Sequence, residues 1–277
     1  MTSLIRSIWE INENPPAVSA TEVTQLFNLE KLARDDAGVF LDLAKTFFDD
    51  VETSSLDSLH VSCKVDLVAG CELARTGYFK QAYALWRAWF EQSLFALYFL
   101  EAPIHRFAWK TTAEVSMDDS PNYRLMLHQL LAESSERHPF ALVYDDRYMR
   151  LLNELKIDLK SIKKERRPIR IATRVLTTLS QGVHGTYQPK PPRNEQDVYS
   201  LLEKHCLQIL EKAVDTVALY WLLFLTANIG LPPDVLIALR DGILTDAQAT
   251  ATDLPGAEKL MQLAPIFKRS IGSAVNG

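Results

Sequence analysis

Two oppositely charged side chains, Arg87 and Glu91, lie in the middle of residues 75–100, the longest helical stretch of high apolar content in the chain. Because they are four residues apart, they meet on one face of a helix. Tryptophan, alanine and phenylalanine surround them in the sequence, so we expect the pair to be partly buried. A buried ion pair is a poor source of stability, since the lost hydration offsets the attraction. The pair therefore indicates either a functional site or a polar network with a purely structural role.

A second candidate is His184, at the end of a helix predicted over residues 169–184. One polar stripe lies beside the apolar face of this helix at the helical period, formed by Thr173, Thr177, Ser180 and His184. A hydroxyl four residues before a histidine, here that of Ser180, can hydrogen-bond the ring. A histidine that titrates near neutral pH is a natural acid or base. The alternative is a histidine that caps the helix and interacts with the C-terminal end of its dipole.

The segment 156–174 carries eight basic residues against two acidic ones, in a chain whose formal net charge is −5. Such a cluster can bind phosphate groups electrostatically. No aromatic residue interleaves it, so the stacking platform typical of single-strand binders is missing. The alternative is an ordinary solvated surface. The candidates for contacts to nucleic acid are Lys163, Lys164, Arg166, Arg167, Arg170 and Arg174.

Several classes of site are not indicated by the sequence. Cys63 and Cys71 are eight residues apart and His205 adjoins Cys206, and neither spacing forms a tetrahedral metal site. We therefore expect buried cysteines and neither a metal nor a cofactor. The chain also has no glycine-rich phosphate loop, no GxSxG and no HExxH motif.

The compartment is predicted from the cysteine count and from the hydrophobic segments. An odd total of three cysteines favours a reducing compartment over a disulfide framework. The most apolar run, residues 217–229, is too short to cross a membrane. The first residues lack the apolar core of a signal peptide. The sequence thus predicts a cytoplasmic protein without a membrane segment.

Helical periodicity runs through most of the chain, and no segment alternates with the period of a strand, which predicts an all-α helical bundle. Proline and glycine separate the predicted helices, and Asp35, Asp36 and Gly38 are expected to divide the apolar run 26–48 into two. Residues 52–57 read as a polar connection. We expect a bundle domain over residues 1–230, with its core at about 59–230, and a C-terminal helical appendage over 231–277. The other predicted helices cover residues 1–16, 59–73, 123–135, 145–155, 195–229, 233–240 and 257–270.

Two of these segments together resemble HEPN-like bacterial proteins. The pattern Gly77-x4-Ala82-x4-Arg87-x3-Glu91 inside a long apolar helix is similar to the second-helix signature of that group. The later Ser180-x3-His184-Gly resembles a helix of an uncharacterised bacterial branch. The resemblance covers residues 59–229. It implies a helical bundle with extra N- and C-terminal helices, often dimeric.

The resemblance also implies two alternative functions. Many HEPN proteins are metal-independent ribonucleases of toxin–antitoxin and phage-defence systems, and others are non-catalytic modules. The catalytic form has an arginine shortly before its histidine, whereas nine residues separate Arg174 from His184 here, which puts the two about 15 Å apart along a helix. Either Arg87 supplies the arginine or the nuclease activity is absent.

The first alternative is an endoribonuclease. His184 would then act as general acid or base, Arg87 would stabilise the phosphorane and Glu91 would orient Arg87. The second is a binding or scaffolding module that dimerises or binds a nucleotide or a protein partner.

Overall fold

The computed structural model describes residues 18–47, 50–101, 139–159, 167–184, 195–250, 252 and 257–276. Within these ranges all regular elements are helical, which confirms the all-α prediction. The predicted helices at residues 1–16 and 123–135 lie outside the described ranges. The elements are α2 (Ala20–Phe47), α3 (Asp50–Arg75), α4 (Phe79–Glu101), α7 (Pro139–Glu154), α8 (Pro168–His184), α9 (Glu195–Ile229), α10 (Pro233–Asp241), α11 (Asp246–Thr250), the 3₁₀-helix η4 (Ala257–Gln262) and α12 (Leu263–Asn276).

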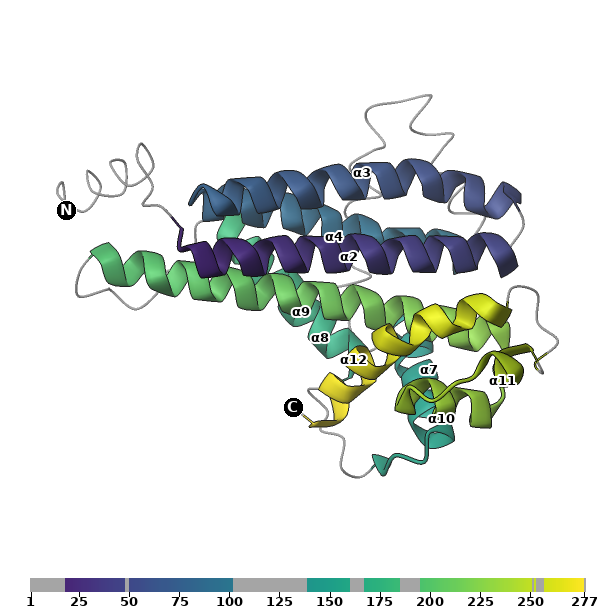
Figure 1. The fold of residues 1–277 in the computed structure, drawn as a ribbon. Helices are drawn as coiled ribbons and strands as arrows, with labels where there is room; N and C mark the ends of the chain where they lie inside the picture. Colours follow the sequence, from purple (N-terminus) through teal and green to yellow (C-terminus); the bar gives the residue numbers. More distant parts are fainter. Residues whose placement is uncertain are drawn as a thin grey trace.

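Four long helices, α2, α3, α4 and α9, lie side by side and form the main bundle (Figure 1). α3 packs against α4, α2 packs against α9 and α3, and α4 also packs against α8 and α9. The shorter helices α10, α11 and α12 gather beneath one half of α9 in this view, near α7. This arrangement encloses α4 on most sides and explains why its sequence is apolar almost all round.

The helix ends follow from local sequence. Ser19 caps the start of α2, and its Oγ accepts the backbone N–H of Glu22 at 3.3 Å. The Ser19 hydroxyl also contacts the Glu22 carboxylate, as in a capping box. Gly77 joins α3 to α4 with a φ of 85°, a left-handed conformation that favours glycine. The N–H of Tyr78 donates to the carbonyl of Leu73 at 2.8 Å, which closes the end of α3.

Two predicted interruptions are wrong. α2 continues without a break through Asp35, Asp36 and Gly38. Asp36 is buried against Arg269 of α12 and Phe40 packs in the core, so tertiary contacts on both sides hold the helix together. A single glycine costs a helix only about 1 kcal/mol. Residues 52–57, predicted as a connection, belong to α3, which begins at Asp50.

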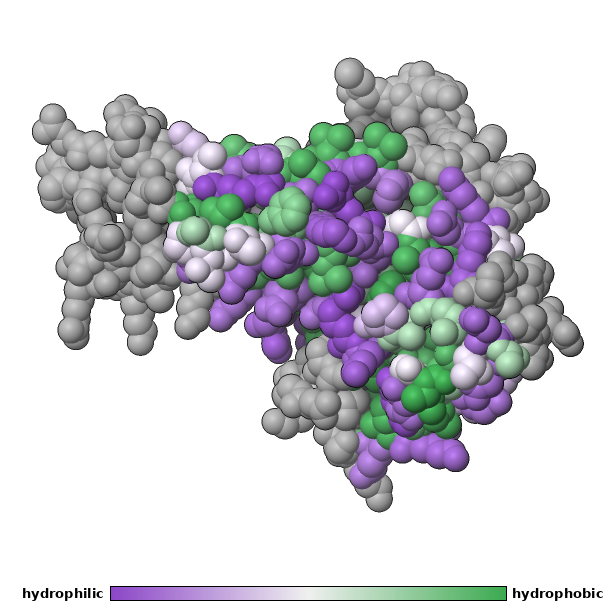
Figure 2. Space-filling model, viewed as in Figure 1, coloured by the Kyte–Doolittle hydropathy of each residue, from purple (hydrophilic) through white to green (hydrophobic). Residues whose placement is uncertain are grey.

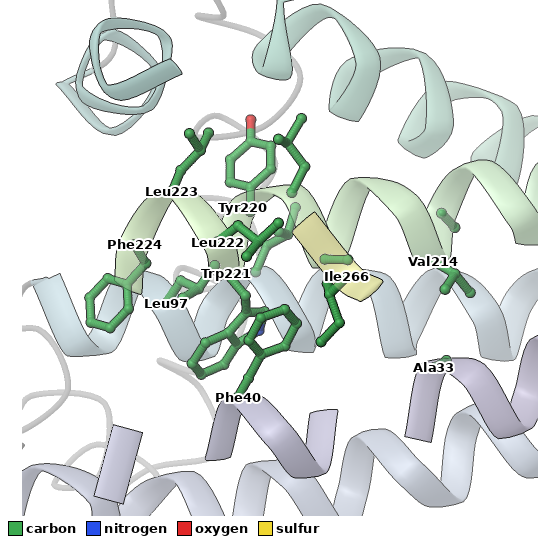
Figure 3. Packing of buried hydrophobic residues seen from close by; sticks show 14 of the residues in the cluster. Ala33, Phe40, Leu97, Val214, Tyr220, Trp221, Leu222, Leu223, Phe224 and Ile266 are labelled. Atoms are coloured by element: carbon green, nitrogen blue, oxygen red, sulfur yellow. The ribbon is translucent and has the colours of Figure 1, made fainter. Parts of the chain in front are cut away.

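One hydrophobic core extends from α2 to α12. In the close view, Phe40 of α2 lies against Trp221 of α9, and Ile266 of α12 approaches from the side (Figure 3). The two rings stack with centroids 5.6 Å apart. The segment after residue 230 packs on this core, since α12 contacts α9 and Arg240 of α10 donates to the carbonyl of Leu155 at 2.8 Å.

The surface seen from the same side mixes hydrophilic and hydrophobic residues (Figure 2). Hydrophilic residues prevail over the middle of the bundle, and hydrophobic ones gather near its upper edge and over the C-terminal helices. Among the described helices, none combines the length and the apolar character that a membrane span requires.

Candidate functional site

Arg87 and Glu91 form an ion pair on α4. The Arg87 Nε donates to the Glu91 Oε1 at 2.8 Å. Only 16% of the Arg87 side chain and 20% of the Glu91 side chain are exposed to solvent. The predicted partial burial is therefore confirmed. The contact with Glu91 and the partial burial hold the Arg87 guanidinium in one orientation.

Tyr83 lies one helical turn before Arg87 and faces α9. Its hydroxyl is 2.8 Å from Nδ1 of His205, and the Tyr83 side chain is buried. Burial and the nearby charge of Lys212 lower the pKa of His205 below its ordinary value. Residues at i and i+4 are neighbours on a helix, so Tyr83, Arg87 and Glu91 form a line of polar groups along α4.

The sequence predicts neither member of this tyrosine–histidine contact. For His205 it offers only the neighbouring Cys206, which does not form a metal site. The sequence does indicate that Tyr83 lies on the same helix face as Arg87, because it precedes Arg87 by four residues in the same apolar helix. Nothing in the sequence indicates that His205 is its partner, since 122 residues separate His205 from Tyr83.

The helix that carries Ser180 and His184 packs against α4 and against α9. Ser180 is half-buried, and its hydroxyl donates to the carbonyl of Leu176 at 2.7 Å. His184 is the last residue of α8, and its side chain lies outside the described part of the chain. The two helices are thus in contact, while a bond from Ser180 to the histidine ring stays a prediction.

The basic candidates differ in their surroundings. Lys163, Lys164 and Arg166 lie outside the described residues. Arg167 is 43% exposed and its Nη1 is 3.8 Å from the Asp145 carboxylate of α7. Arg170 is half-buried and Arg174 is exposed on α8.

Asp145 also bonds the first turn of α8 directly. Its carboxylate accepts the backbone N–H of Ile169 at 3.5 Å, in the first turn of that helix. Burial raises the pKa of Asp145 above its ordinary value, with the Ile169 N–H and Arg167 opposing that effect. Arg167 therefore helps to hold the start of α8, whereas Arg174 is exposed on the same helix.

The cysteines are buried free thiols, as predicted. Burial raises the pKa of both Cys63 and Cys71 to about 12. Within the described ranges, no group of three or more histidine, cysteine or acidic side chains is arranged to hold a metal ion.

Comparison of the chain with protein-family models, with curated proteins and with solved structures found no match. The similarity to HEPN-like proteins therefore rests on the two short motifs around Arg87 and His184.

Proposed function

We propose that this protein is a HEPN-like endoribonuclease that works without a metal ion, at a site formed by α4 and α8. The observation that carries the proposal is the packing of α8 against α4. One helix holds the Arg87–Glu91 pair in a mostly enclosed position, and the other ends at His184.

The chemistry follows from these residue types. His184 takes the proton of an RNA 2′-hydroxyl as that oxygen attacks the neighbouring phosphorus. The 5′-oxygen takes a proton from water as it leaves, and His184 then releases its proton to solvent, so the products are a 2′,3′-cyclic phosphate and a 5′-hydroxyl end. Arg87 stabilises the negative charge that builds up on the phosphoryl oxygens, and Glu91 keeps Arg87 oriented. Ser180 takes no chemical step in this scheme, because its hydroxyl already bonds the backbone of α8.

The basic residues supply the attraction for RNA. Arg170 and Arg174 lie on α8 itself, and Lys163, Lys164, Arg166 and Arg167 precede it. Contacts to phosphate bind without reading sequence and weaken steeply as salt rises. Such a protein would act in the cytoplasm as a dimer within a toxin or phage-defence system, so its production would slow bacterial growth.

The experiment is an RNA-cleavage assay in EDTA. Purified protein is incubated with a labelled oligoribonucleotide, and the ends of the products are identified. We expect 5′-hydroxyl products from the unchanged protein and none from His184→Ala. Arg150→Ala is the matched control, since Arg150 is 74% exposed and pairs with Asp146 on α7. Equal cleavage by all three proteins, or none by any, contradicts the proposal.

A non-catalytic module is the second candidate, and one observation favours it. Arg87 and Glu91 satisfy each other, and Ser180 bonds its own helix, as expected of residues that hold a bundle together. In that case the protein binds RNA or a nucleotide at low salt in a filter-binding assay, and the bound molecule is recovered uncleaved. Arg87→Ala then lowers stability or binding while cleavage is absent throughout.

A further inference from the structure

A cavity of about 60 Å³ lies inside the main bundle, between α2, α3, α4 and α9. On α4 it is lined by Trp89, Ser93 and Ala96. These residues face away from Arg87 and Glu91, because the two sets differ by about half a turn at the helical period. The cavity is therefore separate from the site proposed for RNA.

Small side chains create this space. Ala33 and Ala37 lie one turn apart on α2, and Ala96 and Ala218 line the cavity from α4 and α9. Around them are large apolar groups, among them Phe40, Trp89 and Trp221. Figure 3 shows Phe40 and Trp221 together in this region, with Ala33 facing Val214. The interior is thus suited to an apolar chain.

The mouth of the cavity carries positive charge. Arg34 of α2 and Lys64 of α3 supply it, and His60 lies among the lining residues. Arg34 is 36% exposed and lies 3.5 Å from Glu30, whose carboxylate also accepts from Arg75 at 2.9 Å.

The Nε of Arg34 is buried and has no hydrogen-bond partner. A buried N–H without an acceptor is rare in folded proteins and often marks the place of a water or an ion. Asp36 also lines the cavity, but its carboxylate is bound to Arg269 of α12. Arg34 therefore pairs with Glu30 through Nη2 and still has a buried Nε–H that no acceptor satisfies.

We propose that this cavity binds a short-chain carboxylate. Its carboxylate group pairs with Arg34, whose planar guanidinium matches that geometry. Its alkyl chain lies between Trp89 and Trp221. A water-sized group needs about 10–15 Å³ of such space, so the cavity admits a chain of about four to six carbons.

The test uses hexanoate as the probe, with hexanol and acetate for comparison. Binding is followed by calorimetry and by the fluorescence of the tryptophans that line the cavity. We expect hexanoate to bind, hexanol to bind about tenfold more weakly because it lacks the charge, and acetate to show no binding. Arg34→Gln should weaken hexanoate about tenfold and leave hexanol unchanged.

Two further variants keep the test decisive. Lys31→Gln is the matched control, since Lys31 lies on the same helix, is 59% exposed and pairs with Asp35 outside the cavity. It should leave hexanoate affinity unchanged. Ala37→Leu fills the mouth and should abolish binding in a folded protein. Failure of hexanoate to bind the unchanged protein overturns the proposal, and so does equal affinity for hexanoate in the unchanged protein and in Arg34→Gln.

Discussion

The hydroxyl of Tyr83 lies 2.8 Å from Nδ1 of His205, and this contact ties the centre of the bundle to α9. Burial and Lys212 lower the pKa of His205, which favours the neutral ring, and a neutral ring can accept a hydrogen bond. Arg87 follows Tyr83 by one turn on the same helix. The contact thus fixes the part of α4 that carries the proposed RNA site.

Replacing Tyr83 with phenylalanine should lower the free energy of unfolding by about 1 kcal/mol, because a buried hydrogen bond is lost while the ring is kept. Urea denaturation measures this change. Tyr78→Phe is the control, since Tyr78 is only half-buried at the start of the same segment, and it should stay within about 0.5 kcal/mol of the unchanged protein. Equal stability of Tyr83→Phe and the unchanged protein would show that the contact adds nothing.

The close approach of α3 and α4 depends on Gly70. A Cβ at this position would lie 2.6 Å from the Trp86 ring, and Trp86 is fully buried. Gly70→Ala should therefore destabilise the protein by about 1–3 kcal/mol through overpacking. Thermal and chemical unfolding check the value.

Gly38 provides the opposite case on α2. A Cβ there meets no atom within 4 Å. Gly38→Ala should stabilise the protein by about 0.5–1 kcal/mol, because alanine has the higher helix propensity. The same sign of change for both glycines would contradict this account of the packing.

Gly38 also shows why the sequence predicts some helix boundaries and not others. Pro168 at the start of α8 and Pro232-Pro233 after α9 act through the local backbone, so the sequence predicts those ends within one residue. Gly38 and the neighbouring aspartates are local signals for a break, but contacts with distant residues override them. The partner of Asp36 is Arg269, 233 residues away, and no pattern in the sequence predicts that pairing.

The same limit applies to the site. The spacing of Arg87 and Glu91 predicts their ion pair, and their apolar neighbours in the sequence predict its partial burial. A pairing across helices, such as that of Tyr83 with His205, depends on how α4 and α9 pack. Spacing within one helix contains no information about that packing.

Asp36 should make the stability of the protein depend on pH. Burial raises its pKa from 3.8 to about 6, although Arg269 opposes the shift. Between these two values the folded state holds a proton that the unfolded state has lost, so the contribution of Asp36 to stability falls as pH rises. Asparagine does not titrate, so Asp36→Asn does not lose this stability as pH rises. The free energy of unfolding of Asp36→Asn minus that of the unchanged protein should increase by about 2–3 kcal/mol between pH 4 and pH 8.

Asp35→Asn is the control for this measurement. Asp35 is 59% exposed and pairs with Lys31 on the surface, where such pairs contribute little. Its effect should be small and nearly constant over the same pH range. Asp215, whose pKa is also raised by burial, shares Arg269 with Asp36, so the measured change reports the two carboxylates together. A difference between Asp36→Asn and the unchanged protein that stays flat from pH 4 to pH 8 argues against a buried, proton-binding Asp36.

The central claim is that α4 and α8 form one site, and a double-mutant cycle on RNA cleavage in EDTA tests it most directly. The four proteins are the unchanged chain, Arg87→Ala, His184→Ala and the double variant. Residues that act as a unit give strongly non-additive losses, so we predict that the double variant is no slower than the slower single variant. Losses that add as independent factors, or an unchanged protein that leaves RNA intact, would contradict the claim.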